Sequence, residues 1–168
     1  MSWLLALPIA IPFLTAVATF LARDIPAGRW LSVIGSSILL IAAIVLMNAV
    51  LSEGVIAGQM GGWAAPFGIT LVADLLSAVM VLITAIVAVA VSIYALADVD
   101  EKMERLGYHA LFNMLIAGVV GAFVTGDLFN LYVWFEVMLI ASFGLLVLGG
   151  RPEQIDGGEK YVALNLVS

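Results

Sequence analysis

The chain has 168 residues, of which 64% are hydrophobic and 11% charged, and its mean hydropathy is +1.21. Soluble domains contain roughly 45–50% apolar and 25% charged residues, so this composition predicts a multi-pass integral protein of the cell membrane. The net charge of -6 without a basic patch excludes nucleic acid as a partner, and the absence of cysteine with a single histidine excludes disulfides, iron–sulfur clusters and histidine-rich metal sites in this chain.

Six apolar stretches follow one another along the chain. Because about 20 apolar residues cross a bilayer, we expect spans at 3–22, 30–51, 74–97, 110–125 and 129–148, and the start of a sixth at 160–168. The predicted fold is all-α: a polytopic transmembrane helix bundle with five full spans plus the start of a sixth. The last nine residues are about 13 Å of helix, less than half of a bilayer core, so we expect the chain to be the front part of a longer polypeptide.

Two connections between these spans have distinctive sequences. The Gly-rich segment before the third span contains "GITLV", whose alternation predicts a short strand or hairpin, with a plain loop as the alternative. The connection "TGD" is so short that the fourth and fifth spans must form an antiparallel hairpin. Gly118 and Gly121 on the fourth span would let these two helices approach closely.

The positive charges predict the orientation of the chain. Each odd-numbered connection between spans holds two basic residues and the even-numbered connections hold none. Positively charged loops stay on the cytoplasmic side of a membrane, so the odd connections are expected there and the N-terminus outside. The six basic residues of the chain are Arg23, Arg29, Lys102, Arg105, Arg151 and Lys160.

The stretch "NLYVWFEVMLIASFGLLVLGG" carries one acid, Glu136, inside an apolar run. A charge within a spanning helix costs a few kcal/mol and marks a functional site by default. Desolvation favours the neutral acid and a facing lysine would favour the ionised form, so Glu136 is our candidate for proton transfer, with Tyr132 one helical turn before it. A static ion pair or a neutral hydrogen-bonded acid is the alternative. No Lys, Arg or His lies in the membrane interior of the predicted spans, so its partner is expected outside this chain.

Asp74 and Asp127 lie at the outer ends of predicted helices. Asp127 is expected to cap the fifth span by accepting from amides near Asn130, in preference to binding an ion. For Asp74, a cap of the third span and an acidic group on an ion access path are both open. His109 at the opposite boundary could sense pH, but we favour an interfacial residue, and we expect the acidic run "DVDEKMER" to be a solvated connector or a docking surface for a partner subunit.

Several polar residues within the spans are expected to form hydrogen bonds between helices. They are Ser36, Ser37, Asn48, Thr84 and Ser92. The sequence contains no phosphate loop, dinucleotide fingerprint, nucleophile elbow or metalloprotease helix. We therefore expect neither an enzyme nor a cofactor-binding or metal-binding protein.

Three segments carry a resemblance to a known family: "WAAPFGITLVADLLSA" (63–78), "GAFVTGDLFNLYVWFEVMLIAS" (121–142) and "LVLGG" (146–150). In this order the sequence resembles the front third of the D subunit of Mrp-type multisubunit Na⁺/H⁺ antiporters, and it is similar to the antiporter-like membrane subunits of NADH:quinone oxidoreductase. The resemblance implies a helical fold with inverted repeats, and that Glu136 matches a glutamate that pairs with a lysine on a later, broken helix.

The function that we expect is that of a membrane subunit of a monovalent cation (Na⁺)/proton antiporter, with Glu136 in the proton path. Its partners would be other membrane subunits of the complex, protons, Na⁺ or a similar cation, and the lipid bilayer. The alternatives are a proton-pumping membrane subunit of a redox complex and a purely structural scaffold subunit.

Overall fold

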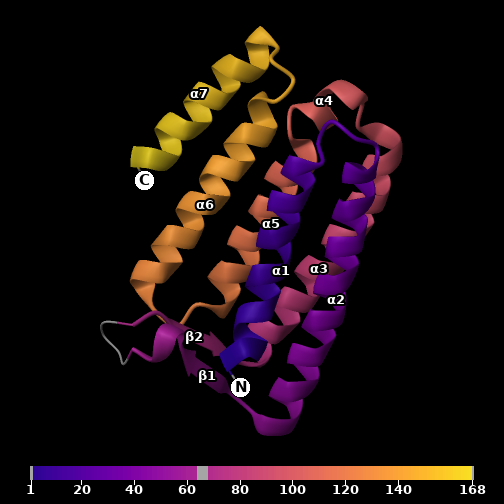
Figure 1. The fold of residues 1–168 in the computed structure, drawn as a ribbon. Helices are drawn as coiled ribbons and strands as arrows, with labels where there is room; N and C mark the ends of the chain where they lie inside the picture. The colour runs from indigo at the N-terminus through magenta and orange to yellow at the C-terminus, as the bar shows by residue number, and fades with distance from the viewer. Residues whose placement is uncertain (1, 64–67, 168) are drawn as a thin grey trace.

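The computed structural model describes residues 2–63 and 68–167 of the chain, which form seven α-helices, one short 3₁₀ helix and a small sheet (Figure 1). Residues 64–67, within the first segment of the family resemblance, lie outside the described ranges. The helices are α1 (Ser2–Leu21), α2 (Ala27–Glu53), η1 (Met60–Gly62), α3 (Leu75–Asp98), α4 (Glu101–Arg105), α5 (Tyr108–Val124), α6 (Leu128–Val147) and α7 (Pro152–Val167), and the strands are β1 (Ile56–Gln59) and β2 (Thr70–Ala73).

The long helices have the length and apolar composition of membrane spans. Four of them, α1, α2, α3 and α6, meet this criterion, and α5 is a shorter apolar helix of 17 residues. Large apolar side chains point outward along them, including Leu14, Ile41 and Leu76, each more than 60% exposed. A bilayer would cover such a surface, so the predicted helical membrane protein is confirmed in its broad class.

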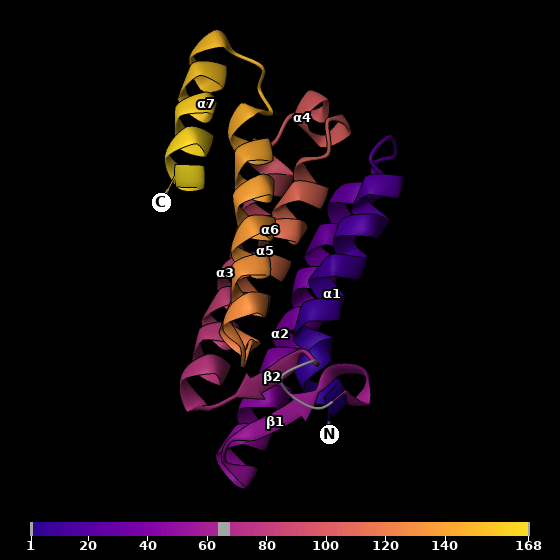
Figure 2. The same cartoon turned by 90° about the vertical axis from the view of Figure 1, so that its left-hand side faces the viewer.

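The core lies between α1, α2, α3 and α5, which pack side by side along their lengths (Figure 2). Small side chains on α2 and α3 bring these helices close, and Ala43, Ala85 and Ala88 are fully buried. Leucines and valines fill the space between the four helices: Leu5, Leu39, Leu46, Val81, Val120 and Val124. These four helices form the frame against which the remaining elements are placed.

Helix α6 is added to this frame through α5, as the short connection predicts. A Cβ atom on Gly118 would lie 2.7 Å from Met138 Cγ of α6, and one on Gly121 would overlap the Trp134 ring. The two glycines therefore permit the close approach that the sequence predicts.

The segment between α2 and α3 forms an antiparallel hairpin rather than a loop. Ile56 pairs with Ala73 and Gln59 with Thr70, and Leu71 bridges to Thr125 between α5 and α6. The predicted alternation in "GITLV" thus corresponds to β2. Its partner β1, "IAGQ", has no such pattern and was not predicted.

The last helix differs from its predicted position. Helix α7 begins at Pro152, eight residues before the predicted start at Lys160. Proline suits the first turn of a helix because it has no N–H to leave unpaired there. Lys160 consequently lies within α7, where its Nζ atom is 2.7 Å from Asp156 Oδ2, and not in the connection.

Candidate functional site

Glu136 lies in the third turn of α6, about 12 Å along the helix axis from Leu128. The face of α6 that packs on α5 carries Trp134 and Met138, and Glu136 points away from it because residues two apart are separated by about 200° around a helix. Its side chain is half-buried. Within the described part of the chain, Glu136 forms no ion pair.

Tyr132 is the polar neighbour of Glu136. It precedes Glu136 by four residues, the spacing at which side chains meet on a helix surface, and its phenol interacts with the Glu136 carboxylate. Tyr132 is itself 62% exposed. The structure therefore brings together the two predicted residues of α6 on one open face.

Helix α7 covers only part of this face. It packs against the C-terminal half of α6, where Gly158 lies against Phe143 and Val147 and the Tyr161 hydroxyl lies 3.1 Å from Ser142 Oγ. Phe143 is seven residues from Glu136, so both lie on nearly the same stripe of the helix. Glu136 is at the edge of the uncovered part.

The rest of the uncovered face is strongly apolar. Only 11% of the α6 span is buried, against 28–33% for the other three spans. Its exposed residues include Leu128, Phe129, Phe135 and Ile140. This face can accommodate lipid or further helices around the single acid.

Asp127 and Asp74 both cap helices. The cap was predicted for Asp127, and for Asp74 it was one of the two open interpretations. The Asn130 amide donates to Asp127 Oδ1 at 2.6 Å, and the Thr70 amide of β2 donates to Oδ2 at 3.2 Å. The Ser77 amide donates to Asp74 Oδ1 at 2.7 Å, and this bond holds the pKa of the Asp74 carboxyl below its ordinary value. Both acids therefore fix the starts of their helices.

A row of buried polar groups lies inside the bundle, away from Glu136. Ser36 and Ser92 hydrogen bond between α2 and α3 with their oxygens 2.8 Å apart, and Asn113 of α5 donates to Ser32 Oγ of α2 at 2.9 Å. The prediction of interhelical bonds is thus correct for the Ser36–Ser92 pair. It is wrong for Ser37 and Thr84, whose hydroxyls donate to carbonyls of their own helices, and Asn48 is exposed.

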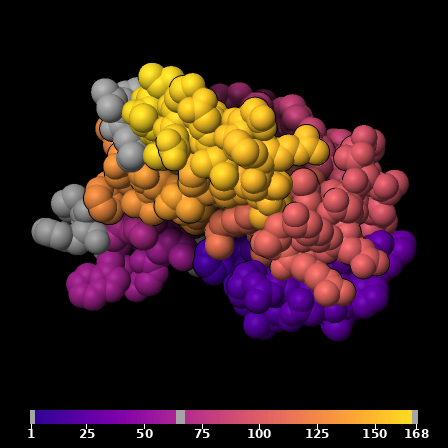
Figure 3. All heavy atoms as spheres, turned by 90° about the horizontal axis from the view of Figure 1, so that it is seen from above, coloured from indigo at the N-terminus to yellow at the C-terminus, as the bar shows by residue number. Residues whose placement is uncertain are grey.

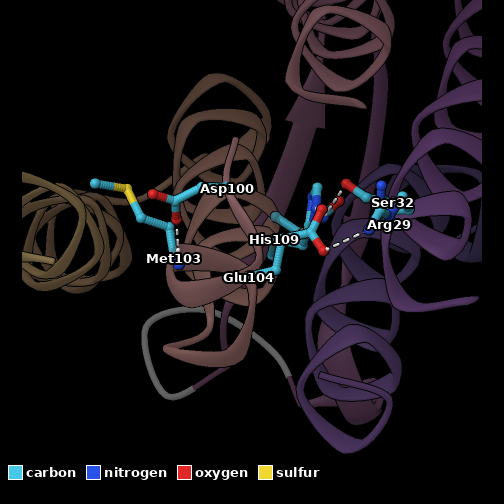
Figure 4. Close-up of polar contacts among 7 residues, drawn as sticks. Arg29, Ser32, Asp100, Met103, Glu104 and His109 are labelled. Carbon is cyan, nitrogen blue, oxygen red and sulfur yellow. Dashed lines mark hydrogen bonds and ion pairs between the residues drawn. The ribbon is translucent and has the colours of Figure 1, made fainter. Parts of the chain in front are cut away.

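An ion cluster lies at the end of this row, where α4 packs against α2 and α5 (Figure 4). Arg29 Nη2 is 3.2 Å from Glu104 Oε2, and His109 Nε2 is 3.5 Å from Glu104 Oε1. His109 is 4% exposed, so its ring lies inside the protein and not on the outer surface of the bundle. The predicted solvated connector is wrong at Glu104, whose side chain is 12% exposed. Sequence reasoning missed this cluster because its members come from three separate elements.

Metal chemistry finds no support in the described residues: none of their His, Asp and Glu side chains form a group of three or more that could hold an ion.

Comparison with curated proteins identifies relatives over nearly the whole chain. It is 43% identical over 163 residues to the D subunit of the Na⁺/H⁺ antiporter of Bacillus subtilis (strain 168), covering 96% of this chain and 33% of that protein. It is 42% identical over 169 residues to the protein of the same name from Alkalihalophilus pseudofirmus, covering 99% of this chain and 34% of that protein. It is 41% identical over 174 residues to the D subunit of a probable K⁺/H⁺ antiporter of Rhizobium meliloti, covering 98% of this chain and 32% of that protein. The chain therefore spans about a third of the length of these relatives.

Two solved structures share this fold. One is the Mrp complex of Dietzia sp. DQ12-45-1b, with a TM-score of 0.87 and 29% identity over 99% of this chain and 32% of that one. The other is the membrane-bound sulfane sulfur reductase, an archaeal respiratory membrane complex, with a TM-score of 0.90 and 28% identity over 97% of this chain and 34% of that one. No family model matches the chain. The resemblance to the D subunits of Mrp-type antiporters, and with it the multi-pass character of a protein of the cell membrane, is confirmed.

Proposed function

We propose that this chain is part of a membrane subunit of a multisubunit Na⁺/H⁺ antiporter, in which Glu136 carries the transferred proton. The observation that supports it most is similarity to antiporter D subunits over 96–99% of the chain, with one acid placed on an open face in the middle of a spanning helix. Other membrane subunits, or further helices of the same subunit, would cover that face.

The topology that we propose has five crossings and an external N-terminus. The α1–α2 turn, α4 and the α6–α7 turn lie at one end of the bundle, and the N-terminus and the hairpin at the other (Figure 1). Five of the six basic residues belong to the first end. By the positive-inside rule this end faces the cytoplasm, and α5, although short, crosses with the rest.

The chemistry proposed for Glu136 follows from its surroundings. When lipid or apolar helices cover the open face, the neutral acid is favoured, and a cation brought close to it favours the carboxylate. Alternation between these two surroundings would bind and release a proton at the Glu136 carboxyl. The Tyr132 phenol beside it can donate a hydrogen bond to the ionised form.

The test is sodium-dependent proton exchange in inverted vesicles that carry the whole complex. Glu136→Gln keeps the side-chain volume but cannot ionise, so it should abolish exchange while the complex still assembles on a native gel. Glu53→Gln, the same substitution at an exposed acid at the end of α2, is the matched control and should exchange like the wild type. Normal exchange by an assembled Glu136→Gln complex would refute the role of Glu136, and loss of assembly would favour a structural role.

A second function has a specific observation in its favour, the similarity to a chain of a respiratory membrane complex. In that case the subunit would move protons in response to electron transfer in a partner arm. Copurification of flavin and iron–sulfur proteins with this chain would support it. Purification of an exchanging complex without them would support the antiporter.

A further inference from the structure

The ion cluster at the α4 end contains buried polar atoms without a hydrogen-bond partner among the described residues. They are Arg29 Nε, Glu104 Oε1, His109 Nδ1 and His109 Nε2. Most buried polar atoms in proteins are paired, so each exception requires an explanation. Here all four belong to three side chains in mutual contact, which points to one shared cause.

The charges around His109 come from every neighbouring element. Glu104 approaches from α4 and is, within the described ranges of the chain, the single acid in contact with the ring, while Arg29 of α2 contacts the other carboxylate oxygen. Arg23, after α1, lines the same cavity, and the Tyr108 ring lies edge-on at 5.3 Å. With His109 neutral, the charges of Arg29 and Glu104 cancel. A proton on His109 would add one positive charge, and Glu104 can accept a hydrogen bond from the imidazolium as well as from Arg29, because a carboxylate has about four acceptor sites.

Water has a short path to this histidine. Arg29, Glu104 and His109 line a cavity of about 10 Å³, close to the space that one water occupies on this measure. A neighbouring surface hollow of about 70 Å³ shares Arg23, Arg29 and Glu104 with that cavity. Figure 3 looks onto this end and shows the α4 segment beside the turn between α1 and α2. The cluster is thus buried yet only one water away from the surface.

We propose that His109 and Glu104 form a proton-binding site that opens to the α4 end of the bundle, separate from Glu136. A proton from bulk solvent, relayed through a water in the cavity that is left as neutral water, adds to the imidazole nitrogen that lacks one, and the resulting imidazolium donates to Glu104 Oε1. The reverse step returns the proton to bulk solvent through the same water. Because Glu104 is on α4 and His109 on α5, proton binding strengthens the attachment of the α3–α5 connector to the bundle.

The test is a pH titration of ¹⁵N-histidine NMR signals from the full chain in lipid nanodiscs. His109 is the single histidine among these 168 residues, and its signal is the one that disappears in His109→Gln. We expect a single titration, with the pKa of His109 below its ordinary value because burial disfavours the imidazolium. Glu104→Gln removes the opposite charge and should weaken proton binding about tenfold or more. Arg29→Gln removes a like charge and should strengthen binding, and it is a second, opposite test if Glu104→Gln does not fold.

The matched control is Glu101→Gln, an exposed acid on the same short helix, which should leave the midpoint unchanged. A histidine that stays neutral over the whole range would overturn the proposal, as would a midpoint that Glu104→Gln moves no more than Glu101→Gln does. The readout is proton binding and not cation exchange, so failure of the antiporter function would leave this result unaltered.

Discussion

Asp127 connects α6 to the sheet, and its two oxygens have different tasks. Oδ1 accepts from the Asn130 amide at the start of α6, and Oδ2 accepts from the Thr70 amide of β2. Alanine removes both acceptors. Asparagine keeps one oxygen for the helix cap, but its NH₂ group would face the Thr70 N–H, where two donors meet.

The expected losses follow from these contacts. An N-cap is worth about 1 kcal/mol, and a hydrogen bond to a charged group about 1.5–3 kcal/mol. At 1.4 kcal/mol per factor of ten, Asp127→Ala should accelerate amide exchange about fivefold at Asn130 and roughly 10- to 100-fold at Thr70. Asp127→Asn should accelerate it at Thr70 alone.

Hydrogen exchange of the chain in nanodiscs, followed at these two amides, measures both effects at once. Because the prediction is a pattern over two sites and two variants, general destabilisation cannot imitate it. Equal acceleration of both amides in Asp127→Asn, or an unchanged Thr70 in Asp127→Ala, would refute the assignment of one oxygen to each element.

Two further predictions concern helix packing. Gly118→Ala should destabilise the chain by about 1–3 kcal/mol in reversible unfolding, because the new methyl meets Met138 and the backbone of α6. The control is Gly157→Ala on α7, which has open space around it and should be neutral or slightly stabilising. Similar losses of stability in both variants would contradict the reasoning. Ser36→Ala and Ser92→Ala should show a coupling of about 0.6 kcal/mol in a double-mutant cycle. The Ser37 hydroxyl bonds its own helix, so Ser37→Ala should not couple to Ser92→Ala. Additive effects of Ser36→Ala and Ser92→Ala would argue against the interhelical bond.

Features that depend on local composition could be predicted from the sequence. The apolar runs predicted the long helices to within a few residues at most ends, and Asp127 after "TG" predicted a cap. Gly118 and Gly121 indicated a close helix contact because only small residues allow one. Each of these signals is contained in a few neighbouring residues.

Features that depend on contacts between distant residues could not be predicted from the sequence. The strand β1 is defined by its pairing with β2 and has little pattern of its own. The burial of His109 and Glu104 depends on where α2 places Arg29, 75 or more positions earlier in the chain. Glu136 was identified from its own run, but the direction in which it points depends on the contact of Trp134 with Gly121.

The attachment of α6 at its first turn makes the helix a lever. Its start is held by Asp127 and by the bond from Gly126 N to Thr70 O, 2.8 Å long, while its far end contacts α7. Glu136 lies about 12 Å from this pivot and Val147 about 29 Å, so tilting the helix moves Glu136 about two-fifths as far as its end. A push of about 2.5 Å on the α6–α7 turn would shift the carboxylate by about 1 Å relative to any group that faces it from another helix, which is sufficient to break a hydrogen bond to that group.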